Sequence, residues 1–134
     1  MLERFAFAGS VFSTFGGNPV AARAALAVLE VIEDERLVRH AKRVGELLRS
    51  RILAIGHPAI REVRGLGLLI GVELDEPDRA RAVVDAMRRY GVLIGRTGPR
   101  GDTLKIRPPL VFAERHVDRL TAALERALGD SQLR

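Results

Sequence analysis

The chain has 134 residues, of which 47% are hydrophobic and 29% charged, and its formal net charge is +5 at pH 7. This length fits one globular domain, and the composition excludes a disordered chain. There is no cysteine, which excludes disulfides, thiolate metal sites and a cysteine nucleophile. No apolar run reaches the ~18 residues of a membrane span. Residues 1–10 lack the layout of a signal peptide. We therefore expect a cytoplasmic protein without a membrane partner.

The positive charge is not gathered into a basic patch along the sequence. Of the 22 basic residues only Lys42 and Lys105 are lysines, and acids alternate with arginines in the segments 33–36 and 78–81. Aromatic residues make up only 4%, too few for a base-stacking platform. The pattern is typical of a solvated basic surface, and we expect no nucleic-acid partner.

The first third of the chain predicts an irregular lead-in followed by two helices. The lead-in, residues 1–17, is rich in phenylalanine. Asn18 and Pro19 suit the N-cap and the first position of a helix. Residues 20–32 are apolar on nearly every face, which predicts a long buried helix. A second, amphipathic helix is expected from Leu37 to about Ala54, where apolar residues recur every three or four positions.

The remainder alternates between strands and helices. Residues 62–74 alternate apolar residues with glycines and predict one strand. A helix begins near Pro77 and ends at Gly91. Short strands are expected at 92–95 and 103–107, separated by a loop rich in glycine and proline.

A final amphipathic helix is expected around residues 117–128. The order of elements predicts an α+β domain, with a three-stranded, mainly antiparallel sheet covered by helices and preceded by the long buried helix. Residues 1–17 would form a lead-in or interface segment, and residues 18–134 the folded domain.

Several common sites are not supported. His40, His57 and His116 are far apart and show no metal-binding spacing, so no metal site is expected. The glycines at 65, 67 and 71 have the wrong spacing for a dinucleotide-binding loop, and they lie inside a predicted strand.

The segment 13–19, Ser-Thr-Phe-Gly-Gly-Asn-Pro, carries the strongest signal. Hydroxyl groups beside flexible glycines can bind a phosphate. Alternatively, Ser13 and Thr14 are ordinary loop hydroxyls. Together with the segments 63–74 and 104–111, the motif resembles class III aminotransferases, which are fold-type-I enzymes that use pyridoxal phosphate. They include acetylornithine, ornithine, 4-aminobutyrate and alanine–glyoxylate aminotransferases.

The resemblance implies that this chain is the small C-terminal domain of such an enzyme. Thr14, with Ser13, would bind the phosphate of pyridoxal 5'-phosphate across the interface of a homodimer. In the family the lysine that carries the cofactor lies upstream of this motif. We therefore assign no catalytic residue here, and expect the chain alone to be inactive.

Lys105 and Arg107 are the candidate substrate-binding residues. Many class III aminotransferases have an arginine at the position of Lys105, where it helps to bind the substrate carboxylate. A lysine there is similar to the alanine–glyoxylate and phospho-lyase-like branch. Alternating positions on a strand share a face, so the two cations could bind an acidic substrate together. The alternative is a pair of surface cations on an edge strand, which discourage aggregation.

The resemblance implies an enzyme that moves an amino group between an amino acid or amine and a keto acid. Two alternatives stay open: a pyridoxal-phosphate-dependent phospho-lyase of the same class, and a non-catalytic α+β interaction module that kept only the fold.

Overall fold

The computed structural model describes residues 13–130. The chain divides into two compact units, the first ending at Glu35 and the second beginning at Arg36. Among the described residues, no helix has both the length and the apolar character needed to cross a membrane. Most of the predicted lead-in, residues 1–12, lies outside the described part.

The first unit contains helix α2, Pro19–Asp34. The predicted start is confirmed: the Asn18 side-chain oxygen accepts hydrogen bonds from the backbone N–H groups of Val20 (2.9 Å) and Ala21 (3.4 Å). The prediction that this helix is buried is wrong for this chain, because none of its residues is buried. The physical reason is that residues 13–35 provide no second layer of apolar side chains against which α2 could pack.

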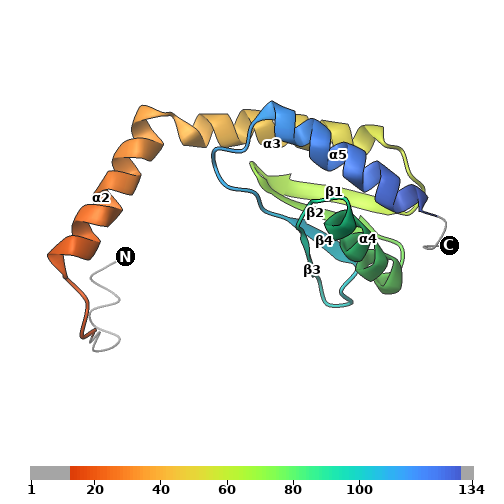
Figure 1. Ribbon diagram of the computed structural model, residues 1–134, viewed down its shortest axis with the longest axis horizontal. Coiled ribbons are helices and arrows are strands. Elements are labelled where there is room, and N and C mark those ends of the chain that lie inside the picture. Colours follow the sequence, from red (N-terminus) through yellow and green to blue (C-terminus); the bar gives the residue numbers. More distant parts are fainter. Residues whose placement is uncertain (1–12, 131–134) are drawn as a thin grey trace. The chain divides into compact units, whose positions relative to one another are not determined.

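The second unit is built on one antiparallel sheet, with the order β1-β2-β4-β3 (Figure 1). Its strands are β1 Ile60–Leu66, β2 Leu69–Leu74, β3 Gly95–Thr97 and β4 Thr103–Ile106. The α+β class is confirmed, but the predicted count of three strands is wrong. The segment 62–74 is a hairpin of two strands, and the strand expected at 92–95 is instead found at Gly95–Thr97.

A two-residue loop turns the hairpin. Leu66 pairs with Leu69, so that only Gly67 and Leu68 connect the strands. Gly67 has a φ of 54°, a left-handed conformation that glycine adopts without steric cost. The Gly67 carbonyl also lies close to the helix of residues 37–54, because a Cβ atom on Gly45 of that helix would be 2.0 Å from the Gly67 oxygen. Glycine at position 45 therefore lets the helix and the hairpin turn approach each other.

Three helices pack against the sheet: α3 Leu37–Ala54, α4 Pro77–Arg89 and α5 Glu114–Gly129. Their apolar faces and one face of the sheet form a single core. Leu48, Val72 and Leu124 are fully buried within it. In Figure 1, α3 and α5 run side by side over the sheet, in agreement with their contacts. The amphipathic helix predicted from Leu37 to about Ala54 is confirmed.

Candidate functional site

The face of the sheet that does not join the core carries the polar residues. In β4, Leu104 and Ile106 are buried in the core, whereas Lys105 alternates with them and is half-buried on the open face. The register places Lys105 between two glycines, Gly71 on β2 and Gly95 on β3. Lys105 is therefore the only one of these three neighbours with a side chain on this row of the sheet.

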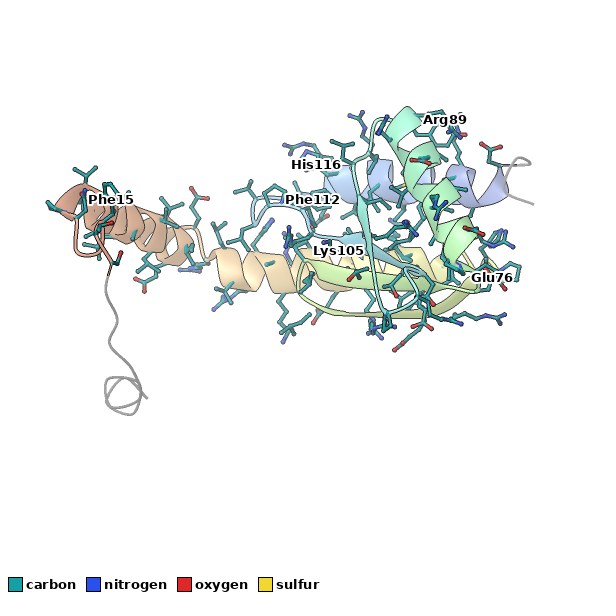
Figure 2. All side chains as sticks on the ribbon, turned by 90° about the horizontal axis from the view of Figure 1, so that it is seen from below. Phe15, Glu76, Arg89, Lys105, Phe112 and His116 are labelled. Carbon is teal, nitrogen blue, oxygen red and sulfur yellow. The ribbon has the colours of Figure 1, made fainter. Side chains whose placement is uncertain are left out.

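Gly95 leaves room for the Lys105 side chain, which is labelled in Figure 2. A Cβ atom on Gly95 would lie 3.5 Å from the Lys105 Cε, which is ordinary van der Waals contact. Among the residues that the structure describes, no hydrogen bond or ion pair involves the Lys105 ammonium group. A half-buried cation without a counter-ion can bind an anion from solution.

Arg107 follows one residue after the end of β4 and is exposed. It lines two grooves of the second unit, one with Phe112 and His116, the other with Leu66 and Leu69. The described part of the chain offers its guanidinium no ion-pair partner. Lys105 and Arg107 are thus neighbours in sequence, but Lys105 lies within the strand and Arg107 at its exit.

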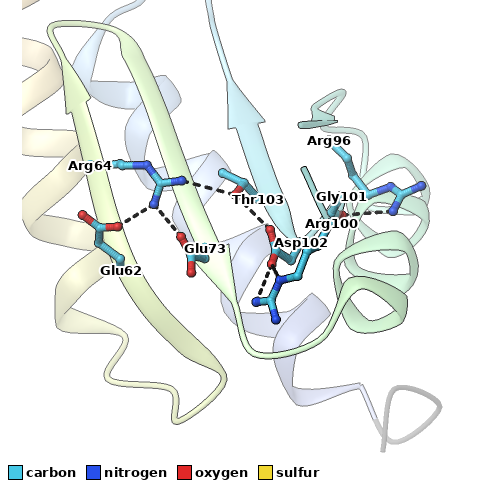
Figure 3. A network of polar contacts seen from close by, with 8 residues as sticks. All are labelled: Glu62, Arg64, Glu73, Arg96, Arg100, Gly101, Asp102 and Thr103. Carbon is cyan, nitrogen blue, oxygen red and sulfur yellow. Dashed lines mark hydrogen bonds and ion pairs between the residues drawn. The ribbon is translucent and has the colours of Figure 1, made fainter. Parts of the chain in front are cut away.

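An ion-pair network occupies the other end of the open face (Figure 3). Glu62 on β1 stands directly opposite Glu73 on β2. Two carboxylates in this position repel each other. Arg64 bridges them, because its Nη1 donates to Glu62 Oε2 at 2.5 Å and to Glu73 Oε2 at 2.7 Å. The hydrogen bond to Glu73 has the largest effect and that to Glu62 the next largest, and together they raise the pKa of Arg64 above its ordinary value.

The network continues through Thr103 to the loop before β4. Arg64 Nη2 lies 3.5 Å from Thr103 Oγ1, which in turn donates to Asp102 Oδ1 at 3.3 Å. Arg100 donates to Asp102 Oδ2 from Nε at 2.7 Å. Burial raises the pKa of the Asp102 carboxyl, but Arg100 and the other donors outweigh it and hold the pKa below its ordinary value. Asp102 thus anchors the loop as a carboxylate.

This network was not predicted from the sequence, and it lies beside Lys105 on the sheet. Arg64 runs over Gly71, since a Cβ atom there would lie 3.8 Å from the Arg64 Cγ. Both nearby carboxylates are held by Arg64, so neither neutralises Lys105. A turn placed at Gly67 and Leu68 from the sequence would have put Glu62 opposite Glu73.

Ser13 and Thr14 lie in the first unit, whereas Lys105 and Arg107 lie in the second. Both hydroxyl residues are exposed in a turn, which is closed by a hydrogen bond from Gly16 N–H to the Ser13 carbonyl at 3.2 Å. Gly17 has a φ of 75°, a conformation that favours glycine. No described residue engages either side-chain hydroxyl group.

This turn is compatible with a phosphate ligand in one respect. Two exposed hydroxyl donors are available, and hydroxyls can bind phosphate oxygens. The first N–H groups of α2 are less available, because Asn18 already accepts hydrogen bonds from two of them. A phosphate here would therefore contact side chains rather than the helix terminus.

No cluster of three or more histidine, aspartate or glutamate side chains suited to a metal ion occurs in residues 13–130. The second lysine of the chain, Lys42, is exposed on α3. A lysine that reacts with a carbonyl group needs a lowered pKa, which burial in an apolar pocket provides. Lys42 borders the groove that contains Leu66 and Leu69, but it is exposed there and not buried.

Comparison with known proteins places these features in context. A family model described as aminotransferase class-III matches residues 2–128. An acetylornithine aminotransferase from Mycobacterium tuberculosis is 47% identical over 121 residues, which are 87% of this chain and 30% of that protein. The ethanolamine-phosphate phospho-lyase homolog 1 of Caenorhabditis elegans is 40% identical over 128 residues, 87% of this chain and 27% of that protein.

Solved structures are similar in the same way. A phospholyase from Arthrobacter in complex with phosphoethanolamine has a TM-score of 0.87 at 37% identity, and the match covers 96% of this chain and 33% of that one. The acetylornithine aminotransferase from Elizabethkingia anophelis has a TM-score of 0.78 at 34% identity, covering 90% and 32%. The chain thus spans about 30% of the length of the curated relatives that it matches.

Proposed function

The chain belongs to the class-III aminotransferase family, and we propose that it forms the C-terminal part of a pyridoxal-phosphate-dependent enzyme. The complete enzyme moves an amino group between an amino acid or amine and a keto acid. The observation that carries this proposal is the family match over residues 2–128, because it includes both candidate sites. When bound, pyridoxal phosphate supplies the electron sink for the reaction, and the protein supplies orientation and charge.

In this proposal Thr14, assisted by Ser13, binds the cofactor phosphate through its hydroxyl group. Two properties of the turn support the assignment: both residues are exposed, and their hydroxyls are not engaged by described residues. The cofactor-carrying lysine is provided by the part of the enzyme that this chain does not cover. Lys42 and Lys105 do not carry the cofactor, and the chain alone does not turn over.

Lys105 binds the acidic group of the substrate, and Arg107 adds positive charge nearby. The support is the position of Lys105, which pairs with a glycine on each neighbouring strand and has no counter-ion among residues 13–130. A lysine contacts a carboxylate or phosphate as a point charge, whereas an arginine grips it with two parallel hydrogen bonds. The lysine therefore accepts acidic groups of more than one geometry.

Two further properties follow from the proposal. The enzyme is a homodimer in the cytoplasm, and each subunit lends its Thr14 to the partner. The exposed apolar side chains of α2 support the presence of an interface, because soluble proteins rarely leave such surfaces uncovered. Sedimentation of the complete enzyme would test the dimer, and a monomer would contradict it.

A chimeric enzyme tests the proposed function. The matching part of the acetylornithine aminotransferase from Mycobacterium tuberculosis is replaced by this chain, and amino transfer from acetylornithine to a keto acid is measured. We expect activity. We expect Thr14→Ala to weaken pyridoxal phosphate binding and Thr14→Ser to restore it. If the chimera is active and Thr14→Ala leaves its affinity for pyridoxal phosphate unchanged, Thr14 does not bind the cofactor phosphate.

The substrate role is tested in the same chimera. Removal of the charge in Lys105→Ala should raise the KM for the acidic substrate, and Lys105→Arg should recover most of the loss. Arg107→Ala should have a smaller effect. The matched control is Arg61→Ala, which removes an exposed charge of β1. An equal effect of Lys105→Ala and Arg61→Ala would show that Lys105 acts only through overall charge.

A phospho-lyase of the same family is the second candidate, and it is favoured by the similarity to the Arthrobacter phospholyase. Release of inorganic phosphate from phosphoethanolamine by the chimera, in place of amino transfer, would support it. A chimera that folds and binds the cofactor but performs neither reaction would favour the non-catalytic interaction module.

A further inference from the structure

A groove of about 370 Å³ lies in the second unit, apart from the open face of the sheet. It is bordered by the segment after α4, the exit of β4 and the first turns of α5. Its size is within the range of small-molecule sites, which are largely apolar with a few polar groups. Most of its lining is apolar: Val92, Leu93, Ile94, Ile106, Pro108, Pro109, Phe112 and Leu120.

The ionisable groups that line this groove are all basic. Arg107, Arg119 and His116 line it, and no carboxylate does. The Arg119 guanidinium lies over Gly91, because a Cβ atom on Gly91 would be 2.9 Å from Arg119 Nη2. Gly91 has a φ of 78°, so glycine is required there by the backbone as well. Among the described residues, no hydrogen bond or ion pair engages Arg119.

His116 supplies a second donor, whose position follows from a hydrogen bond to its ring. Its Nδ1 accepts a hydrogen bond from the Ala113 backbone N–H at 3.1 Å. A neutral imidazole that accepts at Nδ1 carries its hydrogen on Nε2 and donates from there. The ring packs against Phe112, with centroids 5.2 Å apart (Figure 2). The Phe112 carbonyl is in turn within 2.9 Å of His40 Nε2, which fixes this wall of the groove to α3.

We propose that this groove binds a small apolar carboxylic acid, with its hydrocarbon part on the apolar lining and its carboxylate at Arg119 and His116. An unpaired guanidinium is the group best suited to a carboxylate. An apolar lining favours a ligand with a hydrocarbon body over a small inorganic ion. This inference concerns a site distinct from Lys105, and it does not rest on aminotransferase activity.

The test is a titration of the complete 134-residue chain with octanoate, followed by amide NMR. We expect saturable binding, with the largest shifts at Gly91, Val92 and Leu120. Octanol lacks the charge and should bind at least about tenfold more weakly, since one charge-assisted hydrogen bond is worth roughly that factor. Acetate keeps the charge but lacks the hydrocarbon chain, and it should also bind at least about tenfold more weakly because it buries far less apolar surface.

The variant Arg119→Gln should weaken octanoate binding about tenfold by the same reasoning. Arg51→Gln is the matched control, because Arg51 is an exposed helix arginine of α3 that does not line the groove. Unchanged amide spectra away from the groove would verify that both variants are folded. The proposal would be overturned if both variants lost the same octanoate affinity or if binding did not saturate. It would also be overturned if the largest amide shift changes occurred at Leu66 and Leu69.

Discussion

Helices α2 and α3 show how differently two apolar helix sequences can behave in one chain. In α3, apolar residues occupy one face, and Leu48 is fully buried. In α2, apolar residues occupy nearly every face, yet Leu29 remains 56% exposed. An amphipathic pattern predicts both burial and the buried face. A helix that is apolar all round predicts only that something covers it. For α2, we propose that this covering surface is supplied by the complete enzyme.

The sharpest test of this contrast is a pair of matched substitutions. Leu48→Ala removes a fully buried side chain and should lower the free energy of unfolding by about 2–5 kcal/mol. Leu29→Ala, in the exposed helix, should change it by less than about 0.5 kcal/mol. Urea unfolding of the two variants measures the difference. Similar losses in both would mean that α2 is buried in the isolated chain.

The second prediction concerns the contact between α3 and the hairpin turn. A Cβ atom on Gly45 would lie 2.0 Å from the Gly67 oxygen, so Gly45→Ala must push the helix away from the turn. We expect a loss of about 1–3 kcal/mol in unfolding free energy, typical of overpacking. Gly129→Ala is the control, since nothing lies within 4 Å of that position. If Gly45→Ala does not change the free energy of unfolding, α3 and the hairpin turn are not in close contact.

A smaller effect is expected from the network on the open face of the sheet. Arg64→Gln leaves Glu62 and Glu73 facing each other without their bridge. We expect the variant to have a lower Tm than the parent at low ionic strength. The difference in Tm should be smaller at high salt, because salt screens the repulsion. Arg61→Gln, which removes a neighbouring exposed charge, should show little change. A loss of Tm in Arg64→Gln that does not depend on the salt concentration would argue against repulsion as its cause.

The smallest effect is a dependence of stability on pH. The folded state holds the pKa of Asp102 below its ordinary value of 3.8. A lowered pKa stabilises the folded state above the unfolded pKa, and the contribution is lost as the pH falls through the folded pKa. Asp102→Asn should therefore be less stable than the parent at neutral pH, and this difference should shrink in acid. A difference that is constant with pH would contradict the ion pair with Arg100.

The helices could be predicted closely from the sequence, and the sheet less so. The apolar spacing from Leu37 to Ala54 defined α3, and Asn18 with Pro19 defined the start of α2, because these signals are local. The sequence predicts one strand in place of the hairpin because the alternation of residues 68–74 continues through Gly67 without a break. A glycine at the first position of a two-residue loop was the available signal.

The candidate site was only partly predictable for the same reason. Lys105 was identified from its position in a family motif, but its surroundings depend on strand register. Only the pairing of β4 with β2 and β3 places it between Gly71 and Gly95. The Arg64 network likewise requires the hairpin to exist. Non-local pairing is the information that a periodicity analysis cannot supply.

The central claim is that this chain contributes to a cofactor site without carrying the cofactor itself. The most direct test is to mix the purified chain with pyridoxal phosphate, reduce with borohydride so that any lysine-bound cofactor is fixed, and determine the mass of the intact protein. We predict no specific adduct. A single stoichiometric adduct at Lys42 or Lys105 would contradict the account, since the chain would then hold the cofactor by itself.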